Sequence, residues 1–161
     1  MKHILAEGVD YRKTLFFAAG GFCAVAVVCY LAFDLGYTLL IASFGASTAI
    51  LFGTPGTVTS RPRNVFFGHV ISVIIGVALY TFLGCTWYSV ALGVALAVVV
   101  MVVTDTFHPP GGATVIVTMM SSPSWSFVVM PVAVGILAIL VIAKATAWFY
   151  RRSAEPKIIV A

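Results

Sequence analysis

Two long stretches without a single charged side chain constrain this chain more than any other feature. Residues 64–104 and 106–143 contain no Asp, Glu, Lys or Arg. An apolar helix of about 20 residues crosses the hydrocarbon core of a bilayer, from which charged groups are excluded. Over the 161 residues, 61% are hydrophobic and 9% charged, whereas soluble domains have roughly 45–50% and about 25%. The sequence therefore predicts an integral membrane protein, and it argues against a soluble, disordered or disulfide-stapled fold.

Four apolar runs are long enough to cross a bilayer, namely residues 14–33, 64–84, 87–103 and 127–150. Residues 64–104 as one helix would be about 62 Å long, twice the thickness of the hydrocarbon core. We therefore expect the chain to turn near Gly84-Cys85-Thr86. The last run ends at Trp148-Phe149-Tyr150 and then Arg151-Arg152, which is typical of a membrane interface.

Two shorter apolar segments, residues 37–52 and 108–121, are rich in Gly, Ser and Thr and are either short crossings or re-entrant hairpins. The distribution of cations favours crossings. Six crossings place all the cationic groups that flank the spans in the cytoplasm, whereas two re-entrant segments would place the group at Arg61 and Arg63 outside. These groups are Lys2, Arg12 and Lys13, then Arg61 and Arg63, then Arg151, Arg152 and Lys157. We predict cytoplasmic segments at 1–13 and 151–161 around a transmembrane domain at 14–150.

The two halves of this domain, about 14–84 and 87–150, repeat the same order of parts. In each half a span ends at an Asp, a small-residue motif follows, and a Pro precedes the next span. Three crossings per half require the second copy to be inverted, as in many secondary transporters. The expected fold is thus an all-α polytopic transmembrane helical bundle with two short interrupted helices and a 3+3 inverted repeat. Alternatively, small residues such as those of Gly68-xxx-Ser72-xxx-Gly76 only permit close helix packing.

The sharpest motif is His108-Pro109-Pro110-Gly111-Gly112-Ala113-Thr114. Two prolines suit the first turn of a helix, so a helix is expected to begin here. The amides of Gly111, Gly112, Ala113 and Thr114 would then be free at the positive end of the helix dipole, where anions bind. Free donors at membrane depth are costly, so the motif must face a polar cavity.

Two histidines are candidate site residues. His108 adjoins the expected anion site and is able to donate to an anion or carry a proton; capping a helix or bonding a carbonyl is an equally weighted alternative. Asp105 either orients His108 or, as we favour, caps the helix. His69 lies more than one turn inside a span. Because an ionisable side chain costs free energy at this depth, we interpret His69 as a functional residue.

The first half contributes further candidates. Ser43, Gly45 and Ser47 offer hydroxyls and a glycine at which the helix could open toward the same cavity, although a packing face explains them as well. Asn64 suits the N-cap of the helix that follows. Arg63 either attracts an anion to the cytoplasmic mouth or anchors in the headgroups.

The motif at 108–114, with Gly45-Ala46-Ser47 and Pro62-Arg63-Asn64 followed by Gly68-His69, resembles the HPP family of integral membrane proteins over about residues 14–150. The resemblance implies a small transporter-like protein, with some cyanobacterial and chloroplast relatives associated with nitrite transport. The family is commonly described with four spans, which fits six crossings only if the two short segments were not counted.

These observations favour a carrier or channel for a small monovalent anion, with nitrite as the favoured substrate and proton coupling as an option. The alternatives are a non-transporting membrane subunit or assembly factor, and a transporter of a small neutral solute. No metal triad or cofactor fingerprint is present, so we expect neither an enzyme nor a cofactor. The +4 charge forms no single stripe, which argues against nucleic-acid binding. We expect no leader before the first span, which fits a bacterial inner membrane. Because 161 residues make a thin wall around any pathway and small-residue faces allow helices to pack, we also expect a homo-oligomer.

Overall fold

The structure, a computed structural model, describes residues 9–36 and 40–154, and every regular element in this part of the chain is a helix. The long elements are α1 (Tyr11–Leu35), α2 (Leu40–Gly53), α3 (Pro62–Leu83), α4 (Trp87–Val103), α5 (Pro110–Met120) and α6 (Val134–Ala154). Short 3-10 turns, η1 (Val58–Ser60) and η2 (Trp125–Val128), and a π-helical turn, η3 (Val129–Ala133), connect them. The ends of the chain, including Lys2 and Lys157, lie outside the described residues, as does the start of the short segment predicted at 37–52.

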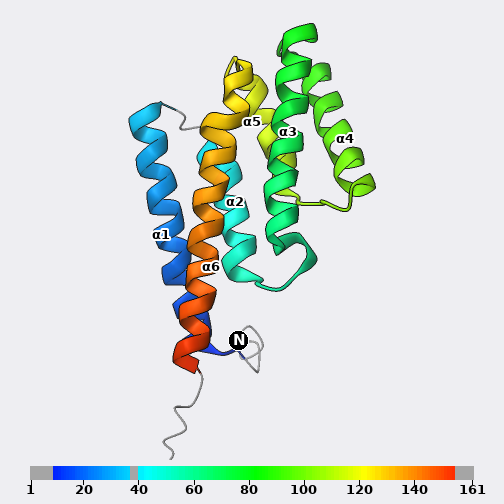
Figure 1. The fold of residues 1–161 in the computed structure, drawn as a ribbon. Coiled ribbons are helices and arrows are strands. Elements are labelled where there is room, and N and C mark those ends of the chain that lie inside the picture. The colour runs from blue at the N-terminus through cyan, green and yellow to red at the C-terminus, as the bar shows by residue number, and fades with distance from the viewer. Residues whose placement is uncertain (1–8, 37–39, 155–161) are drawn as a thin grey trace, which may run out of the picture.

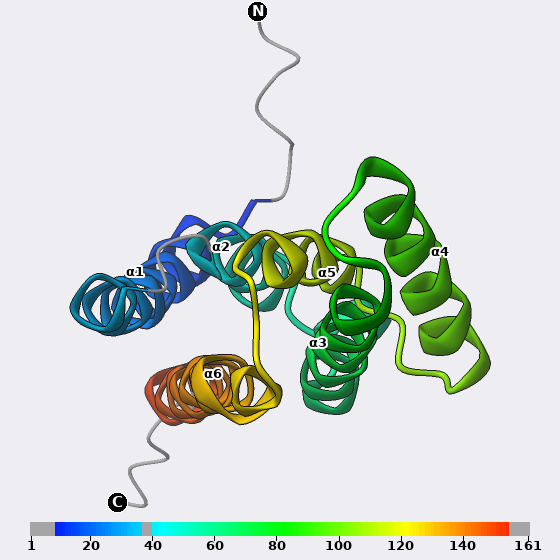
Figure 2. The ribbon, with the colours of Figure 1, turned by 90° about the horizontal axis from the view of Figure 1, so that it is seen from above.

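Successive helices run in opposite directions, so that α1, α3 and α5 point one way and α2, α4 and α6 the other (Figure 1). The beginning of α1 and the end of α6 consequently lie at the same end of the bundle. Seen from above, the two short helices α2 and α5 lie between α1 and α4, with α6 and α3 alongside them (Figure 2). The two short helices thus lie in the middle of this row, with α6 and α3 along one of its sides.

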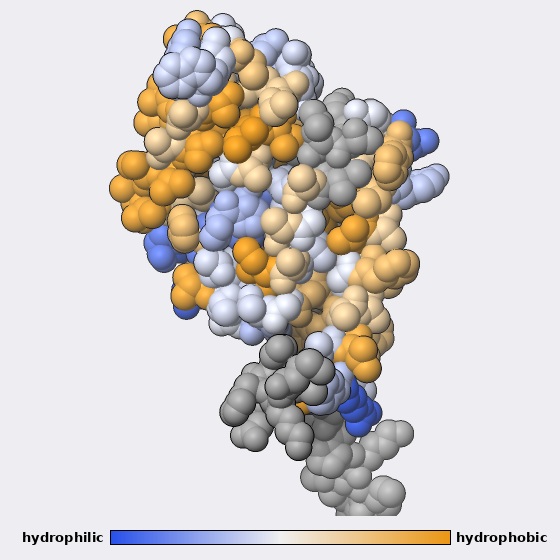
Figure 3. Space-filling model, turned by 180° about the vertical axis from the view of Figure 1, so that it is seen from behind, coloured by the Kyte–Doolittle hydropathy of each residue, from blue (hydrophilic) through white to orange (hydrophobic). Residues whose placement is uncertain are grey.

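Three helical stretches are long and apolar enough to cross a membrane: Tyr11–Asp34, Pro62–Leu83 and Trp125–Ser153, the last made of η2, η3 and α6. Shorter apolar helices cover Ala42–Gly53, Trp87–Val103 and Pro110–Met120. The sequence predicts a full-length span at 87–103, but the 17 residues of α4 extend only about 26 Å. Figure 3 shows hydrophobic residues over the upper and side parts of one face, around a more hydrophilic area at its centre. The protein is therefore an all-α membrane bundle with an alternating path, as six crossings require.

The helix ends follow local capping rules. The Asp10 side chain accepts a hydrogen bond from the first turn of α1, whereas Gly36 closes that helix in the left-handed conformation. Gly84, with φ of 68°, ends α3, and a capping box between Thr86 and Ser89 starts α4. The turn predicted at 84–86 is confirmed.

The sequence predicts one continuous span at 127–150. In the structure this run is interrupted. Met130, inside η3, has non-helical backbone angles, φ −123° and ψ 119°, and breaks the run between η2 and α6. Pro131 follows this break, and a proline has no amide hydrogen with which to continue a helix. The regular helix begins only at Val134.

The halves of the bundle pack in a corresponding way. Helix α1 packs against α2 and α6, and α4 packs against α5 and α3. The first half also runs opposite to the second (Figure 1). This arrangement meets the requirements of a 3+3 inverted repeat, which itself stays a prediction.

Small residues allow α3 and α5 to approach closely. A Cβ at Gly68 would lie 2.7 Å from the His108 Cβ, and a Cβ at Gly76 would lie 3.0 Å from that of Thr118. From the other side, a Cβ at Gly111 would lie 2.7 Å from the Ser72 Oγ. The packing role expected for Gly68-xxx-Ser72-xxx-Gly76 is confirmed.

Candidate functional site

Four polar side chains meet in the centre of the bundle and are completely buried: Ser47 of α2, His69 of α3, His108 of the segment before α5, and Thr114 of α5. They come from both halves of the chain. A buried polar group at membrane depth is stable only when it is hydrogen-bonded. We define these four residues as the histidine cluster.

The histidine cluster is held together by a continuous chain of hydrogen bonds. The Ser47 Oγ lies 2.7 Å from the His69 Nε2 and 2.9 Å from the His108 Nε2, so one hydroxyl joins the two rings. The outer nitrogens are also paired, because the His69 Nδ1 lies 2.7 Å from the Thr114 Oγ1 and the His108 Nδ1 lies 2.8 Å from the Thr59 carbonyl oxygen. The ring centroids are 5.2 Å apart. All four imidazole nitrogens therefore have partners.

The carbonyl at Thr59 fixes the direction of this chain when both rings are neutral. A carbonyl only accepts, so the His108 Nδ1 donates, and its Nε2 accepts the single proton of the Ser47 hydroxyl. Ser47 must then accept from the His69 Nε2, which leaves the His69 Nδ1 to accept from the Thr114 hydroxyl. Every donor consequently points toward Thr59.

Both hydroxyls also have a second acceptor on their own helix. The Ser47 Oγ lies 3.1 Å from the Ser43 carbonyl oxygen, and the Thr114 Oγ1 lies 3.3 Å from that of Pro110. If one proton is added to His108, its Nε2 becomes a donor to Ser47, whose hydroxyl proton turns to the Ser43 carbonyl. If it is added to His69, the Nδ1 becomes a donor to Thr114, whose proton turns to the Pro110 carbonyl. The arrangement can therefore hold one extra proton without leaving a buried donor unpaired.

Packing around the rings fixes their positions. Phe44 contacts the His69 ring edge-on at a centroid distance of 5.5 Å, and a Cβ at Gly135 would lie only 2.5 Å from the Phe44 ring. On the other side, the Asn64 Nδ2 donates to the Phe107 carbonyl oxygen at 3.3 Å. Asn64 thereby ties the segment before α5 to the start of α3.

The prediction of an anion site at free amides of Gly111 and Gly112 is wrong, because both amides are already hydrogen-bonded. The helix begins at Pro110 as predicted, but the Gly111 amide donates to the His108 carbonyl at 2.9 Å and the Gly112 amide to that of Pro109 at 3.0 Å. Gly111 is also packed against Ser72. These two amides are therefore neither free nor turned toward a cavity. Ala113 is half-buried within the regular helix.

Two expected helix caps are also wrong. Asn64 lies in the first turn of α3, whose N-cap is Arg61, and its side chain bonds the Phe107 carbonyl instead. Asp105 lies at φ 52° after the end of α4, whereas Pro109 is the N-cap of α5. A side-chain cap depends on where the backbone turns, which the order of residues alone does not give.

The other expected site residues lie outside the histidine cluster. Arg63 is exposed, with a nitrogen 3.6 Å from the Asp105 carboxylate and a hydrogen bond to the Thr104 carbonyl. Gly45 does not open α2, which stays helical there, and a Cβ at this position would meet no atom within 4 Å. Ser43 contributes its backbone carbonyl to Ser47.

The Thr59 carbonyl and the Phe44 ring are the contacts of the histidine cluster that the sequence did not predict. Any residue type provides a carbonyl, so no sequence signal marks Thr59 for this role. Phe44 stands inside the Ser-Phe-Gly-Ala-Ser string that we had noted, but a phenylalanine in a membrane helix is unremarkable. Within the described part of the chain, no three His, Cys, Asp or Glu residues group as metal ligands.

One further buried hydroxyl lies a turn beyond the histidine cluster on α5. Among the described residues, Thr118 is completely buried and its Oγ1 has no hydrogen-bond partner. Thr118 follows Thr114 by four residues, so both lie on the same face of the helix. The line of polar groups thus continues into the bundle from the histidine cluster.

Comparison with known proteins agrees with the fold. The family described as "HPP, transmembrane region" matches residues 6–156. Two Dictyostelium discoideum proteins, each named as a transmembrane protein, are similar: one is 38% identical over 73% of this chain, and the other 34% identical over 78%. The matched regions are 40% and 47% of those relatives, so the chain spans less than half of their length. No solved structure matches.

Proposed function

Because this chain belongs to the HPP family of transmembrane proteins, we propose that it transports a small monovalent anion, nitrite being the favoured substrate, together with a proton. The observation that supports this proposal is the buried chain of hydrogen bonds through His69, Ser47 and His108. It lies where the two short helices meet α3, in the buried interior of the bundle. Transporters bind their substrates near the middle of the membrane in such places.

Charge balance argues for the coupling to a proton. Bringing an isolated anion into a low-dielectric interior is strongly unfavourable unless a positive charge accompanies it. Among the described residues, the buried side chains that can become cationic are His69 and His108. If an anion enters with one proton, that proton would convert one imidazole to imidazolium. The anion and the imidazolium together would then carry no net charge.

The second acceptors explain how the histidine cluster would tolerate this proton. The carbonyls of Ser43 and Pro110 are in place to accept from Ser47 and Thr114 when the imidazoles become donors. The histidine cluster is closed in this structure, since its four side chains have no exposed surface. Substrate access therefore requires a conformation in which the helices separate, as in alternating access.

The test is uptake of nitrite into proteoliposomes under an imposed proton gradient. Wild-type protein should accelerate uptake when the outside is acidic, and a potential set with valinomycin should leave the initial rate unchanged. His108→Ala and Ser47→Ala should abolish the accelerated uptake, whereas the exposed control Ser126→Ala should not alter it. Uptake no faster than in protein-free liposomes would refute transport of nitrite, and a rate that follows the potential would refute proton coupling.

The same preparation separates the remaining functions. Competition by a series of anions, with a neutral solute of similar size as the comparison, tells an anion site from a neutral one. A stoichiometric partner that copurifies with a chain lacking any flux would favour a non-transporting membrane subunit. The proposal includes a non-enzymatic, homo-oligomeric protein in a bacterial inner membrane with both termini in the cytoplasm, which crosslinking and labelling in membranes would check.

A further inference from the structure

A second cavity lies away from the histidine cluster, at the end of the bundle where α1 begins and α6 ends. Its volume is about 310 Å³, and it is bounded by α6, by α1 and by the connection between α2 and α3. Three cations line it, namely Arg61, Lys144 and Arg151, and none of its lining residues is acidic. We refer to it as the basic cavity.

The three cations have no acidic partner in the part of the chain that the structure describes. The ion pair found there joins Arg63 to Asp105, neither of which lines the basic cavity. Three like charges around one space repel one another, so an anion between them would be favourable.

Apart from the three cations, much of the wall of the basic cavity is apolar. Phe17, Leu51 and Leu140 line it together with alanines of α6. Lys144 and Arg151 are seven residues apart on one face of α6, which separates them by about 10 Å along the helix axis. The cavity therefore runs from the level of Arg151, beside the aromatic residues that mark the membrane interface, toward the hydrophobic interior.

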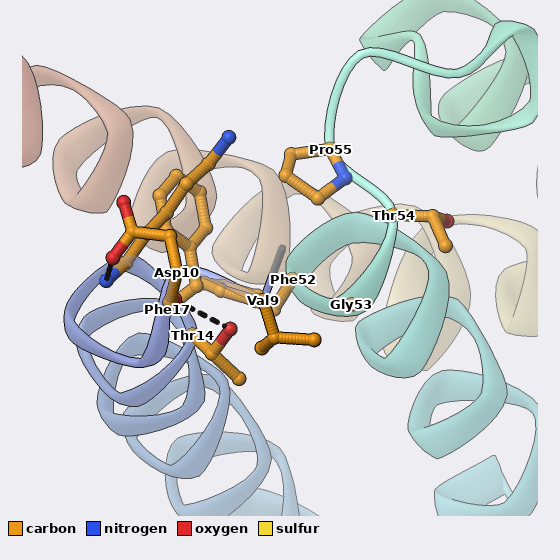
Figure 4. Close-up of a pocket in the computed structure, with 9 residues that line it drawn as sticks. Val9, Asp10, Thr14, Phe17, Phe52, Gly53, Thr54 and Pro55 are labelled. Carbon is orange, nitrogen blue, oxygen red and sulfur yellow. Dashed lines mark hydrogen bonds between the residues drawn. The ribbon is translucent and has the colours of Figure 1, made fainter. Parts of the chain in front are cut away.

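The neighbouring cavity makes a useful contrast. It has a volume of about 400 Å³ and shares Phe17 and Pro55 with the basic cavity, but Asp10 and Lys13 both line it. Figure 4 shows Asp10 at this cavity, close to Phe17 and Thr14. With one acid and one base, this cavity has no net charge, and we assign it no ligand.

We propose that the basic cavity binds the anionic headgroup of a membrane phospholipid, with part of an acyl chain against the apolar wall. Basic pockets between transmembrane helices are a recognised way of holding such headgroups. A free anion of the same chemistry would use the cations but not the apolar wall. A lipid uses both and reaches the cavity from the bilayer.

The test is lipid binding by the full-length protein in detergent, measured by native mass spectrometry with phosphatidylglycerol and phosphatidylcholine as probes. Wild-type protein should bind one phosphatidylglycerol in preference to phosphatidylcholine. Neutralising the cavity with Arg61→Gln, Lys144→Gln and Arg151→Gln should weaken phosphatidylglycerol binding by about a hundredfold, from roughly fivefold per cation.

A charge-matched control separates the basic cavity from the general surface charge. Arg12→Gln, Lys13→Gln and Arg152→Gln remove the same charge from the same end of the bundle but from outside the basic cavity, and should leave the binding unchanged. Equal weakening in both triple variants, or none in either, would overturn the proposal. The melting temperature is also measured with inorganic phosphate and with phosphatidylglycerol. An equal rise with both would refute the proposal that the occupant is a lipid. Melting temperatures of all the variants establish that each is folded.

Discussion

The contact between α3 and the segment before α5 can be tested with a pair of glycine substitutions. Gly68 and Gly45 both lie inside helices, and both were singled out from the sequence as small-residue positions. In the structure a Cβ at Gly68 would lie 2.7 Å from the His108 Cβ and 3.4 Å from the Met101 Sδ, whereas a Cβ at Gly45 would meet nothing within 4 Å. Alanine is therefore expected to give a less stable protein at position 68 than at position 45.

The magnitude follows from comparing the two variants. Replacing a helical glycine with alanine stabilises a helix by up to about 1 kcal/mol through backbone entropy, and this gain is common to Gly68→Ala and Gly45→Ala. Overpacking a tight contact costs about 1–3 kcal/mol and applies to Gly68→Ala alone. Because about 1 kcal/mol changes the melting temperature of a chain of this size by roughly 2–4 °C, Gly68→Ala should melt about 2–12 °C below Gly45→Ala.

The assay is thermal unfolding in detergent, followed by tryptophan fluorescence. Gly45→Ala should melt at or above the temperature of the wild-type protein, and Gly68→Ala below Gly45→Ala. Nitrite uptake should fall in Gly68→Ala, because the clash displaces His108 from Ser47. Equal melting temperatures for the two variants would show that α3 and the His108 segment are not in close contact, and the description of the histidine cluster would then be wrong.

Four further outcomes are expected. Ser47→Ala should lower the melting temperature by several degrees, because it leaves two buried imidazole nitrogens unpaired at about 1–3 kcal/mol each; an unchanged value would contradict the bridge. Thr118→Val should raise the melting temperature, because it removes a buried hydroxyl without a described partner; a lower value would show that the hydroxyl is paired. Asp105→Asn should change stability by less than about 1 kcal/mol, since the ion pair is exposed, and a larger loss would show that the pair is structural. In a cysteine-free protein, Thr54→Cys and Ser124→Cys should be labelled from opposite sides of the membrane; labelling from one side would refute the alternating path.

The positions of the helices could be predicted because hydropathy and charge mark them directly. The span predicted at 64–84 is helix Pro62–Leu83 in the structure, and the turn at Gly84 lies where length alone required one. The break at Met130 was missed because a hydropathy pattern treats an apolar run as uniform. Pro131 was the available signal, since a proline removes a backbone hydrogen bond wherever it lies in a helix.

The site was predictable in its residues but not in its connections. His69 and His108 were singled out because ionisable side chains are expensive inside a membrane. Their common contact with Ser47 depends on the approach of Gly68 to the segment before α5, which brings together parts of the chain that are far apart in sequence. The amides of Gly111 and Gly112 were misjudged because a tight turn after His108 pairs them locally.

The glycine contacts between α3 and α5 limit how the closed centre can open. The glycines leave little space between α3 and α5, so we expect these two helices to move as one rigid body. Of the residues that hold the hydrogen-bonded centre together, Ser47 is on α2, which is outside that body. If the protein transports as proposed, we expect the centre to open by a swing of α2 away from the pair. The connection that carries Gly56, with φ of 93°, joins α2 to this pair and is where we expect the backbone to bend.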